Sequence, residues 1–115
     1  MEFLLLVASD PDAETPDGDG ANADDWVAEM DAIGVRQRGD RLRPPESATT
    51  VRVRNGELVV NGGPYTVSPE KIVGYDIIEC MSVTDAIEVA SAHPMSRFGC
   101  IEIRAMWPMH DDAGD

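Results

Sequence analysis

The feature that most constrains this fold is a continuous apolar run near the start of the chain, Glu2-Phe3-Leu4-Leu5-Leu6-Val7-Ala8. A strand with one face in water alternates apolar and polar residues, and this run does not. We therefore predict a central strand over 2–8 with both faces covered, by a second layer of this chain or by a second subunit. The run is far shorter than the roughly 20 residues of a membrane-spanning helix. No basic region precedes it, so we expect no signal peptide and a cytoplasmic location.

The charge of the chain excludes two classes of partner. It carries 22 acidic and 9 basic residues, for a net charge of -13. An acidic surface of this size repels phosphate backbones and anionic lipids, so we expect neither nucleic acid nor a membrane as partner. The length of 115 residues suits one domain. We assign that domain to 1–107 and expect an acidic, disordered tail over 108–115.

Hydrophobic periodicity predicts two helices and six strands. The expected strands are 2–8, 35–42, 49–54, 57–60, 72–80 and 100–106, and the expected helices are 23–33 and 83–92. Apolar residues recur at helical spacing in both helices, which predicts a buried stripe on each. The first stripe is Trp26, Met30 and Ile33, and the second is Val83, Ala86, Ile87 and Ala90. Asn22 or Asp24 can cap the first helix, and Ser82 or Thr84 the second.

Asn55-Gly56 is a strong hairpin signal, because a type I′ turn needs positive φ at both central residues. Removing the hairpin 49–60 as an insertion leaves the order strand, helix, strand, strand, helix, strand. This is the ferredoxin-like βαββαβ order of an α+β fold. Two helices cover only one face of its sheet. If the other face carries Leu4 and Leu6, a second copy of the same sheet is the simplest partner.

A set of motifs in the second half resembles a known family. Gly62-Gly63-Pro64-Tyr65, then Glu70, then Gly74-Tyr75-Asp76-Ile77-Ile78-Glu79 resembles the signature of the DGPF branch of the YCII-related proteins. Further similarities are Gly34, Leu42-Arg43-Pro44, Thr49-Thr50-Val51-Arg52, Ala86 with Ala90, and His93-Pro94. The resemblance implies a dimeric α+β barrel, in which two ferredoxin-like sheets pack face to face.

The resemblance also implies where chemistry would lie. Members of the wider family with an assigned activity are thought to use a His-Asp pair beside the sheet, with the histidine early in the chain. That histidine has no counterpart here, and Gly62 stands where the family has the aspartate of its name-giving motif. His93 and Asp76 remain as the catalytic candidates. For His93 the alternative is a ring that caps the C-terminus of its helix, where the helix dipole favours positive charge.

The ligand-binding candidates are one aromatic residue of the motif and three charged residues of two strands: Tyr65, Arg41, Glu102 and Arg104. Arg41 belongs to the strand 35–42, where arginines cluster in an otherwise acidic chain. They serve either as surface ion pairs or as a site for a small anion. Glu102 and Arg104 share one face of the last strand, and either pair with each other at a dimer seam or bind a polar ligand. Which of Tyr75 and Asp76 points inward stays open.

The sequence offers no metal or cofactor motif. The aspartates of the loop 9–22 lack the glycine and glutamate of an EF-hand, and Cys80 and Cys100 form no CxxC or Cys/His cluster. In a ferredoxin-like sheet the two cysteines lie two strand spacings apart, roughly 9 to 10 Å, which is too far for a disulfide.

Two functions fit these observations. The first is a homodimeric YCII-like domain that binds a small polar or anionic molecule in a cleft, with lyase- or isomerase-like chemistry and no cofactor. The second is a non-catalytic dimeric module that acts through a protein partner. Its biological setting would be regulation, since DGPF-like proteins are often encoded beside extracytoplasmic-function sigma factors.

Overall fold

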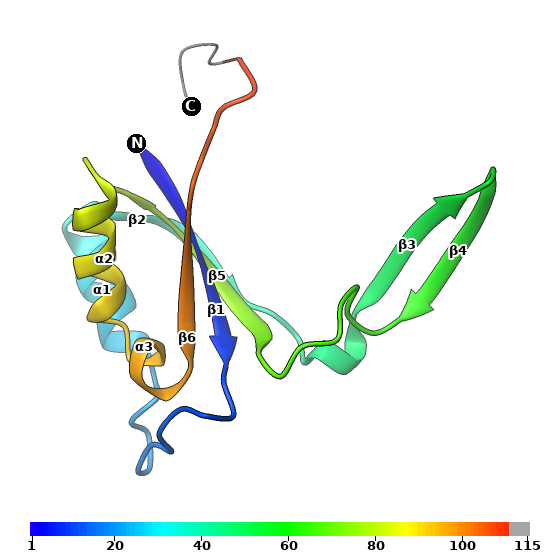
Figure 1. Ribbon diagram of the computed structural model, residues 1–115. Coiled ribbons are helices and arrows are strands. Elements are labelled where there is room, and N and C mark those ends of the chain that lie inside the picture. Colours follow the sequence, from blue (N-terminus) through cyan, green and yellow to red (C-terminus); the bar gives the residue numbers. More distant parts are fainter. Residues whose placement is uncertain (111–115) are drawn as a thin grey trace.

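An antiparallel sheet and three helices form the body of the protein, and a hairpin projects from it (Figure 1). The computed structural model describes residues 1–110. The strands are β1 (Glu2–Ser9), β2 (Arg36–Arg41), β3 (Thr49–Arg54), β4 (Glu57–Gly62), β5 (Lys71–Glu79) and β6 (Cys100–Ala105). The helices are α1 (Asp24–Ala32), α2 (Val83–Ser91) and α3 (Met95–Phe98), with a 3-10 turn at η1 (Pro45–Ser47). The predicted strands and the two predicted helices are present, whereas η1 and α3 were not predicted.

The four strands of the main sheet lie in the order β2-β5-β1-β6, and all neighbours are antiparallel. The long apolar strand β1 is therefore central, as predicted. This order, with α1 between β1 and β2 and α2 between β5 and β6, is compatible with a ferredoxin-like α+β fold.

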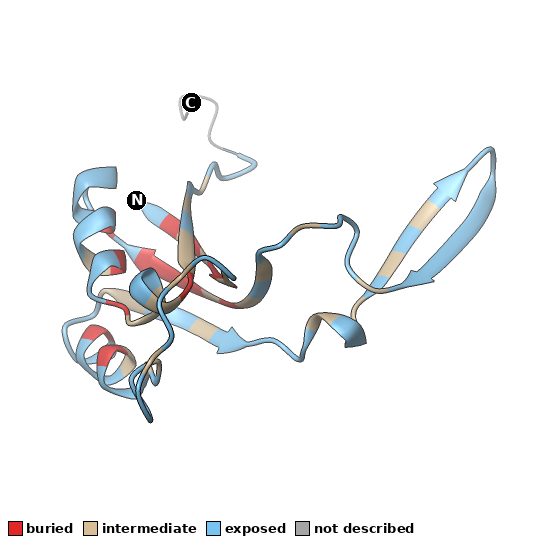
Figure 2. Cartoon of the chain, turned by 60° about the horizontal axis from the view of Figure 1, so that its bottom comes forward, coloured by how far each residue is buried: buried red, intermediate tan, exposed pale blue. Residues whose placement is uncertain are grey.

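The core lies between the helices and one face of the sheet (Figures 1 and 2). Phe3, Leu5 and Ile78 are its largest fully buried side chains. Trp26 and Met30 of α1 pack against them, and the Trp26 indole donates a hydrogen bond of 3.0 Å to the Val89 carbonyl oxygen. The prediction of Trp26 and Met30 as core residues is confirmed.

Three of the seven residues in the predicted helical stripes are exposed. Ile33 is 64% exposed because α1 ends at Ala32, so Ile33 leaves the helical path before the spacing returns it to the core. In α2 only Ala86 and Ala90 are buried, while Val83 and Ile87 are 53% and 54% exposed. The two alanines let the helix approach the sheet closely, which leaves the larger side chains on its flank. Ser82 caps α2 as predicted and accepts from the Asp85 amide at 3.2 Å.

The second face of the sheet has no helix on it (Figure 1). Leu4 lies opposite Ile77, and Leu6 lies opposite Tyr75, so these residues share that face. Leu4 and Leu6 are only half-buried. Asp76 lies opposite Leu5 and therefore points to the helix side. Of the two neighbours Tyr75 and Asp76, it is therefore Asp76 that points toward the helices.

The hairpin β3–β4 is a separate two-stranded ladder. Asn55 and Gly56 have φ of 53° and 79°, which confirms the predicted turn. Figure 2 shows no buried residue in it. The radius of gyration is 16.3 Å, against about 13 Å for a compact chain of this length. The hairpin thus extends away from the body and makes few contacts with it.

The two cysteines are free thiols. The Cys80 amide bonds to the Met1 carbonyl oxygen, whereas Cys100 pairs with Ala8. They lie at opposite ends of β1, separated along the strand by roughly 20 Å. The distance expected from the sequence, roughly 9 to 10 Å, was therefore too short.

No helix among the described residues is both long and apolar enough to span a membrane. The predicted tail falls largely outside the description, which stops at His110.

Candidate functional site

A cleft of about 730 Å³ opens on the helix side of the sheet. It lies where the start of α1, the edge strand β2, the middle of β5 and the junction of α2 with α3 meet. Its acidic and basic lining residues are Asp24, Arg36, Asp40, Arg41, Asp76 and His93. Three sequence candidates, Arg41, Asp76 and His93, therefore line one cleft, although they are separated by up to 52 residues in the chain.

Asp76 is 6% exposed and pairs with Arg36. Arg36 Nε donates to Asp76 Oδ1 at 2.7 Å, and its Nη1 and Nη2 donate to Asp31 and to the Gly39 carbonyl oxygen. Burial raises the pKa of the Asp76 carboxyl, and the hydrogen bond and charge of Arg36 limit this rise. The guanidinium therefore keeps a buried carboxylate in place at the wall of the cleft.

Gly39 makes room for the Asp76 carboxylate. It pairs with Asp76 across β2 and β5. A Cβ atom at position 39 would collide with Asp76 Oδ1 and with the Tyr75 carbonyl oxygen. A side chain at this position would therefore displace the carboxylate or the strand that carries it.

His93 is 5% exposed and lies just after α2. Its ring packs against Trp26 with centroids 4.6 Å apart, and its Nδ1 accepts from the Met95 amide at 2.9 Å. Burial lowers the pKa of His93 to about 4, so the ring is neutral at pH 7.

The expected cap of the α2 C-terminus by a positive His93 is wrong. The ring instead accepts a hydrogen bond from the first residue of α3, the short helix that was not predicted. A protonated ring could not accept there, and burial among apolar groups disfavours the charge that the helix dipole would attract.

Arg41 contributes a positive charge to the rim of the cleft. It ends β2, lies opposite Gly74 and is exposed. Within residues 1–110 its guanidinium makes no hydrogen bond or ion pair that occupies it. The group is therefore available to an anionic ligand.

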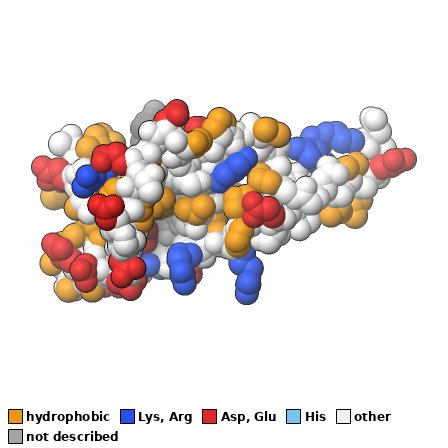
Figure 3. Space-filling model, turned by 90° about the horizontal axis from the view of Figure 1, so that it is seen from below, with side chains coloured by type: hydrophobic (Ala, Val, Ile, Leu, Met, Phe, Trp, Pro, Cys, Tyr) orange, Lys and Arg blue, Asp and Glu red, His pale blue; other side chains and the backbone are white. Residues whose placement is uncertain are grey.

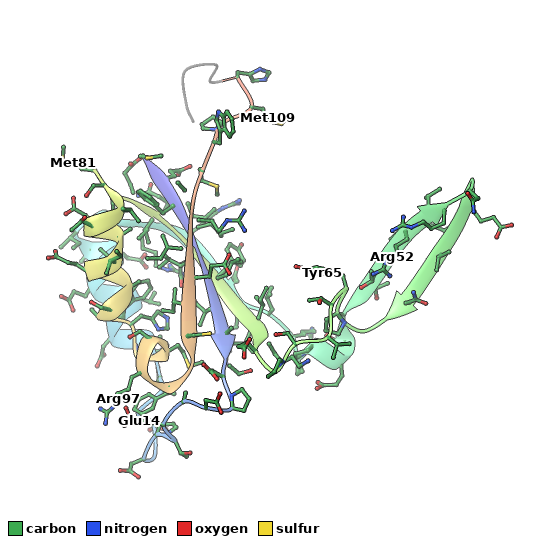
Figure 4. The ribbon with its side chains drawn as sticks, viewed as in Figure 1. Glu14, Arg52, Tyr65, Met81, Arg97 and Met109 are labelled. Atoms are coloured by element: carbon green, nitrogen blue, oxygen red, sulfur yellow. The ribbon has the colours of Figure 1, made fainter. Side chains whose placement is uncertain are left out.

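Tyr65 lies apart from this cleft. It is 72% exposed and lines a second depression of about 460 Å³ between η1 and the segment that precedes β5. Figure 4 places it where the hairpin joins the body, and its carbonyl oxygen accepts from Arg52 at 3.2 Å. The structure does not bring Tyr65 to Asp76 or His93.

Glu102 and Arg104 also lie elsewhere, on the helix-free face beside Leu6 and Leu4. Arg104 Nη1 is 3.3 Å from Glu102 Oε2, and both side chains are more than half exposed. Glu102 and Arg104 therefore pair with each other along β6, as in the first of the two alternatives predicted from the sequence.

Arg36 was missed by sequence reasoning. It is one of four arginines in one segment, and nothing in the sequence indicated that its side chain would be largely buried, with 14% of it exposed. The register of β2 against β5 supplies the missing signal, because it puts Arg36 and Gly39 beside the strand that carries Asp76.

No group of three or more His, Cys, Asp or Glu side chains within residues 1–110 is arranged to hold a metal ion. The cleft combines buried and exposed charges with an apolar wall that includes Val7 and Val27. It can thus bind a small molecule through ion pairs and hydrogen bonds.

Comparison with known proteins gives no functional assignment. No protein-family model matches the chain. A 70-residue stretch is 33% identical to an uncharacterized protein from Rhizobium meliloti (strain 1021). The match covers 57% of this chain and 55% of that relative, so the chain spans about half of the relative's length.

Proposed function

We propose that the protein is a YCII-like domain of the DGPF branch that binds a small polar or anionic molecule in the Asp76–His93 cleft. The observation that carries this proposal is the meeting of two buried ionisable side chains in the lining of one cleft. Buried ionisable groups are costly unless paired, and they gather at functional sites more often than elsewhere. Arg41 at the rim favours a ligand with a negative charge.

A homodimer accompanies this proposal. The helix-free face carries Leu4 and Leu6 at its centre, with Glu102 and Arg104 on the neighbouring strand. An apolar centre with a polar edge is the usual make-up of a subunit interface. A second copy on this face would complete the dimeric α+β barrel that the sequence resemblance implies.

Amide chemical-shift mapping tests the binding proposal. Small carboxylates, phosphate and neutral analogues are added to the ¹⁵N-labelled protein. We expect saturable shifts for Gly39, Gly74 and Met95, which line the cleft, and weaker binding by an Arg41→Gln variant. Arg97→Gln is the matched control, because Arg97 pairs with Glu14 at the surface (Figure 4). Shifts confined to the hairpin, or none with any probe, would contradict the proposal.

A second function is favoured by the hairpin. Val51 pairs with Val60, and Val53 pairs with Leu58, and all four are at least 55% exposed. Figure 3 shows hydrophobic side chains beside basic ones at the hairpin end of the molecule, while acidic side chains gather over the helical end. This surface fits a non-catalytic module that binds a protein partner through the hairpin. Loss of partner binding on hairpin deletion, with the cleft unoccupied by any probe, would favour it.

A further inference from the structure

The two buried ionisable groups of the cleft present opposite hydrogen-bonding atoms to it. His93 Nδ1 accepts from the Met95 amide, so the single proton of the neutral ring sits on Nε2. Every buried side-chain nitrogen or oxygen among the described residues has a hydrogen-bond partner. Nε2 makes no hydrogen bond, and it must therefore be reached by solvent. His93 offers the cleft a neutral N–H donor.

Asp76 offers an acceptor by the same reasoning. Its Oδ1 is bound by Arg36 Nε, whereas its Oδ2 makes no hydrogen bond and must also be reached by solvent. Oδ1 is held by Arg36 Nε and is fitted closely against Gly39. Its free oxygen is thus fixed in direction.

We propose that the protein catalyses proton transfer in this cleft, on a small substrate that bears both a ketone carbonyl and a carboxylate. Asp76 is the base that removes a proton from the carbon next to the ketone, and His93 donates a hydrogen bond to the ketone oxygen. This inference rests on the proposed binding function and names its substrate class. Asp76 Oδ2 takes the proton as the C–H bond breaks. The electron pair forms a C=C bond, and the carbonyl π pair moves to the oxygen that His93 Nε2–H stabilises. Return of the proton restores the carbonyl compound or gives its isomer, so no oxidant or cofactor is needed.

The opposite assignment is excluded by the hydrogen bond of His93. To act as a base through Nε2, the neutral ring would need its proton on Nδ1. That proton would then face the Met95 N–H, and two donors would oppose each other. A neutral imidazole that donates is a suitable polariser of a carbonyl oxygen. Burial raises the pKa of Asp76, which makes it a stronger base than an ordinary aspartate.

Arg41 supplies the anchor for the carboxylate of such a substrate. It lies at the rim of the same cleft, and no acidic partner occupies it within the described part of the chain. A guanidinium binds a carboxylate through two parallel hydrogen bonds, which orients the rest of a small molecule. The substrate class is therefore a carbonyl compound that also bears a carboxylate, such as a 2-oxo acid.

Hydrogen–deuterium exchange tests the proposal. Pyruvate, 2-oxobutyrate and 2-oxoglutarate are incubated in D₂O with the full protein, and loss of the C3 proton signals is followed by ¹H NMR. Acetone is the control probe, because it is a ketone without a carboxylate. We expect at least tenfold faster exchange of one 2-oxo acid than in buffer, and no such effect on acetone.

Matched variants assign the roles. We expect Asp76→Asn to abolish the exchange, because its amide is no base. His93→Asn keeps an oxygen for the Met95 amide, but its shorter side chain withdraws the N–H donor from the position of Nε2, so it should lower the rate at least tenfold. His93→Gln, whose amide reaches further, should retain more activity. Folding of each is checked by amide spectra.

The outcomes separate the two proposals. Shifts of cleft amides by the 2-oxo acids without exchange would overturn the proton-transfer role and leave the binding function standing. Neither shifts nor exchange with any probe would overturn both. Exchange that survives in Asp76→Asn would place the base elsewhere and overturn the assignment.

Discussion

Arg36 Nε on β2 lies 2.7 Å from Asp76 Oδ1 on the adjacent strand β5, and both side chains are largely buried. The same guanidinium bonds to Asp31 in α1 and to the backbone of Gly39. One side chain thus joins a helix to two strands at the wall of the cleft. Because its positive charge is paired with the buried carboxylate, it stabilises the fold locally and favours the ionised form of Asp76.

Replacing Arg36 by methionine should destabilise the protein, because Asp76 is then buried without a cation. The expected loss is about 3 kcal/mol in the free energy of unfolding, with a further rise in the pKa of Asp76. Chemical denaturation measures the first effect, and carboxyl NMR titration measures the second. The double variant Arg36→Met, Asp76→Asn should recover part of the loss. Arg97→Met, which breaks the exposed pair with Glu14, should change little. Equal effects of the two arginine variants would contradict this account.

Gly39→Ala should disturb the site through steric overlap with Asp76 and the Tyr75 carbonyl oxygen. We expect destabilisation by roughly 1 to 3 kcal/mol, as for overpacking of a tight interior site. Amide shifts near Asp76 and a melting curve give the readout. Gly62→Ala is the matched control, since nothing lies within 4 Å of its added methyl group. A Gly39→Ala protein as stable as Gly62→Ala would show that β2 yields easily at this point.

The sequence predicted the strands and the two longer helices well, because their signals are local. The unbroken apolar run gave β1, and Asn55-Gly56 gave the hairpin turn. The site was harder to predict because it depends on register. Asp76 and His93 were chosen as residues, but nothing in the chain showed that they share a cleft or that Arg36 completes it. Tyr65 was grouped with them because it belongs to the motif, and Glu102 because of its face on the last strand. The fold places both outside the cleft.

The pH dependence of stability should report on His93. Burial lowers its pKa to about 4 in the folded protein, against about 6.5 in an unfolded chain. Between these pH values the unfolded chain binds a proton that the folded chain does not. The contribution of His93 to the free energy of unfolding is therefore fully present above about pH 6.5. It is lost as the pH drops to about 4, by roughly 3 kcal/mol in all.

The contribution of His93 is isolated by comparison with His93→Asn at each pH. The raised pKa of Asp76 acts in the opposite direction, since its protonation in acid favours the folded state, and the comparison cancels it. The stability difference between the two proteins should shrink or change sign as the pH falls from 7 to 4. A difference that stays constant would mean that His93 titrates alike in the folded and unfolded chains.

The proposed dimer gives a prediction that separates the two exposed apolar surfaces. Leu6 lies at the centre of the helix-free face, opposite Tyr75 and Glu102, whereas Leu58 lies on the hairpin and is 68% exposed. If two copies pack through the sheet, Leu6→Glu buries an unpaired carboxylate at the interface. At a cost of about 3 kcal/mol, the dissociation constant of the dimer rises more than 100-fold.

Light scattering of Leu6→Glu should then give a monomer mass, with unchanged circular dichroism. Leu58→Glu should leave the dimer intact. The reverse pattern would place the subunit contact on the hairpin, and a monomer for the unaltered chain would refute the barrel, because the half-covered leucines would then face water.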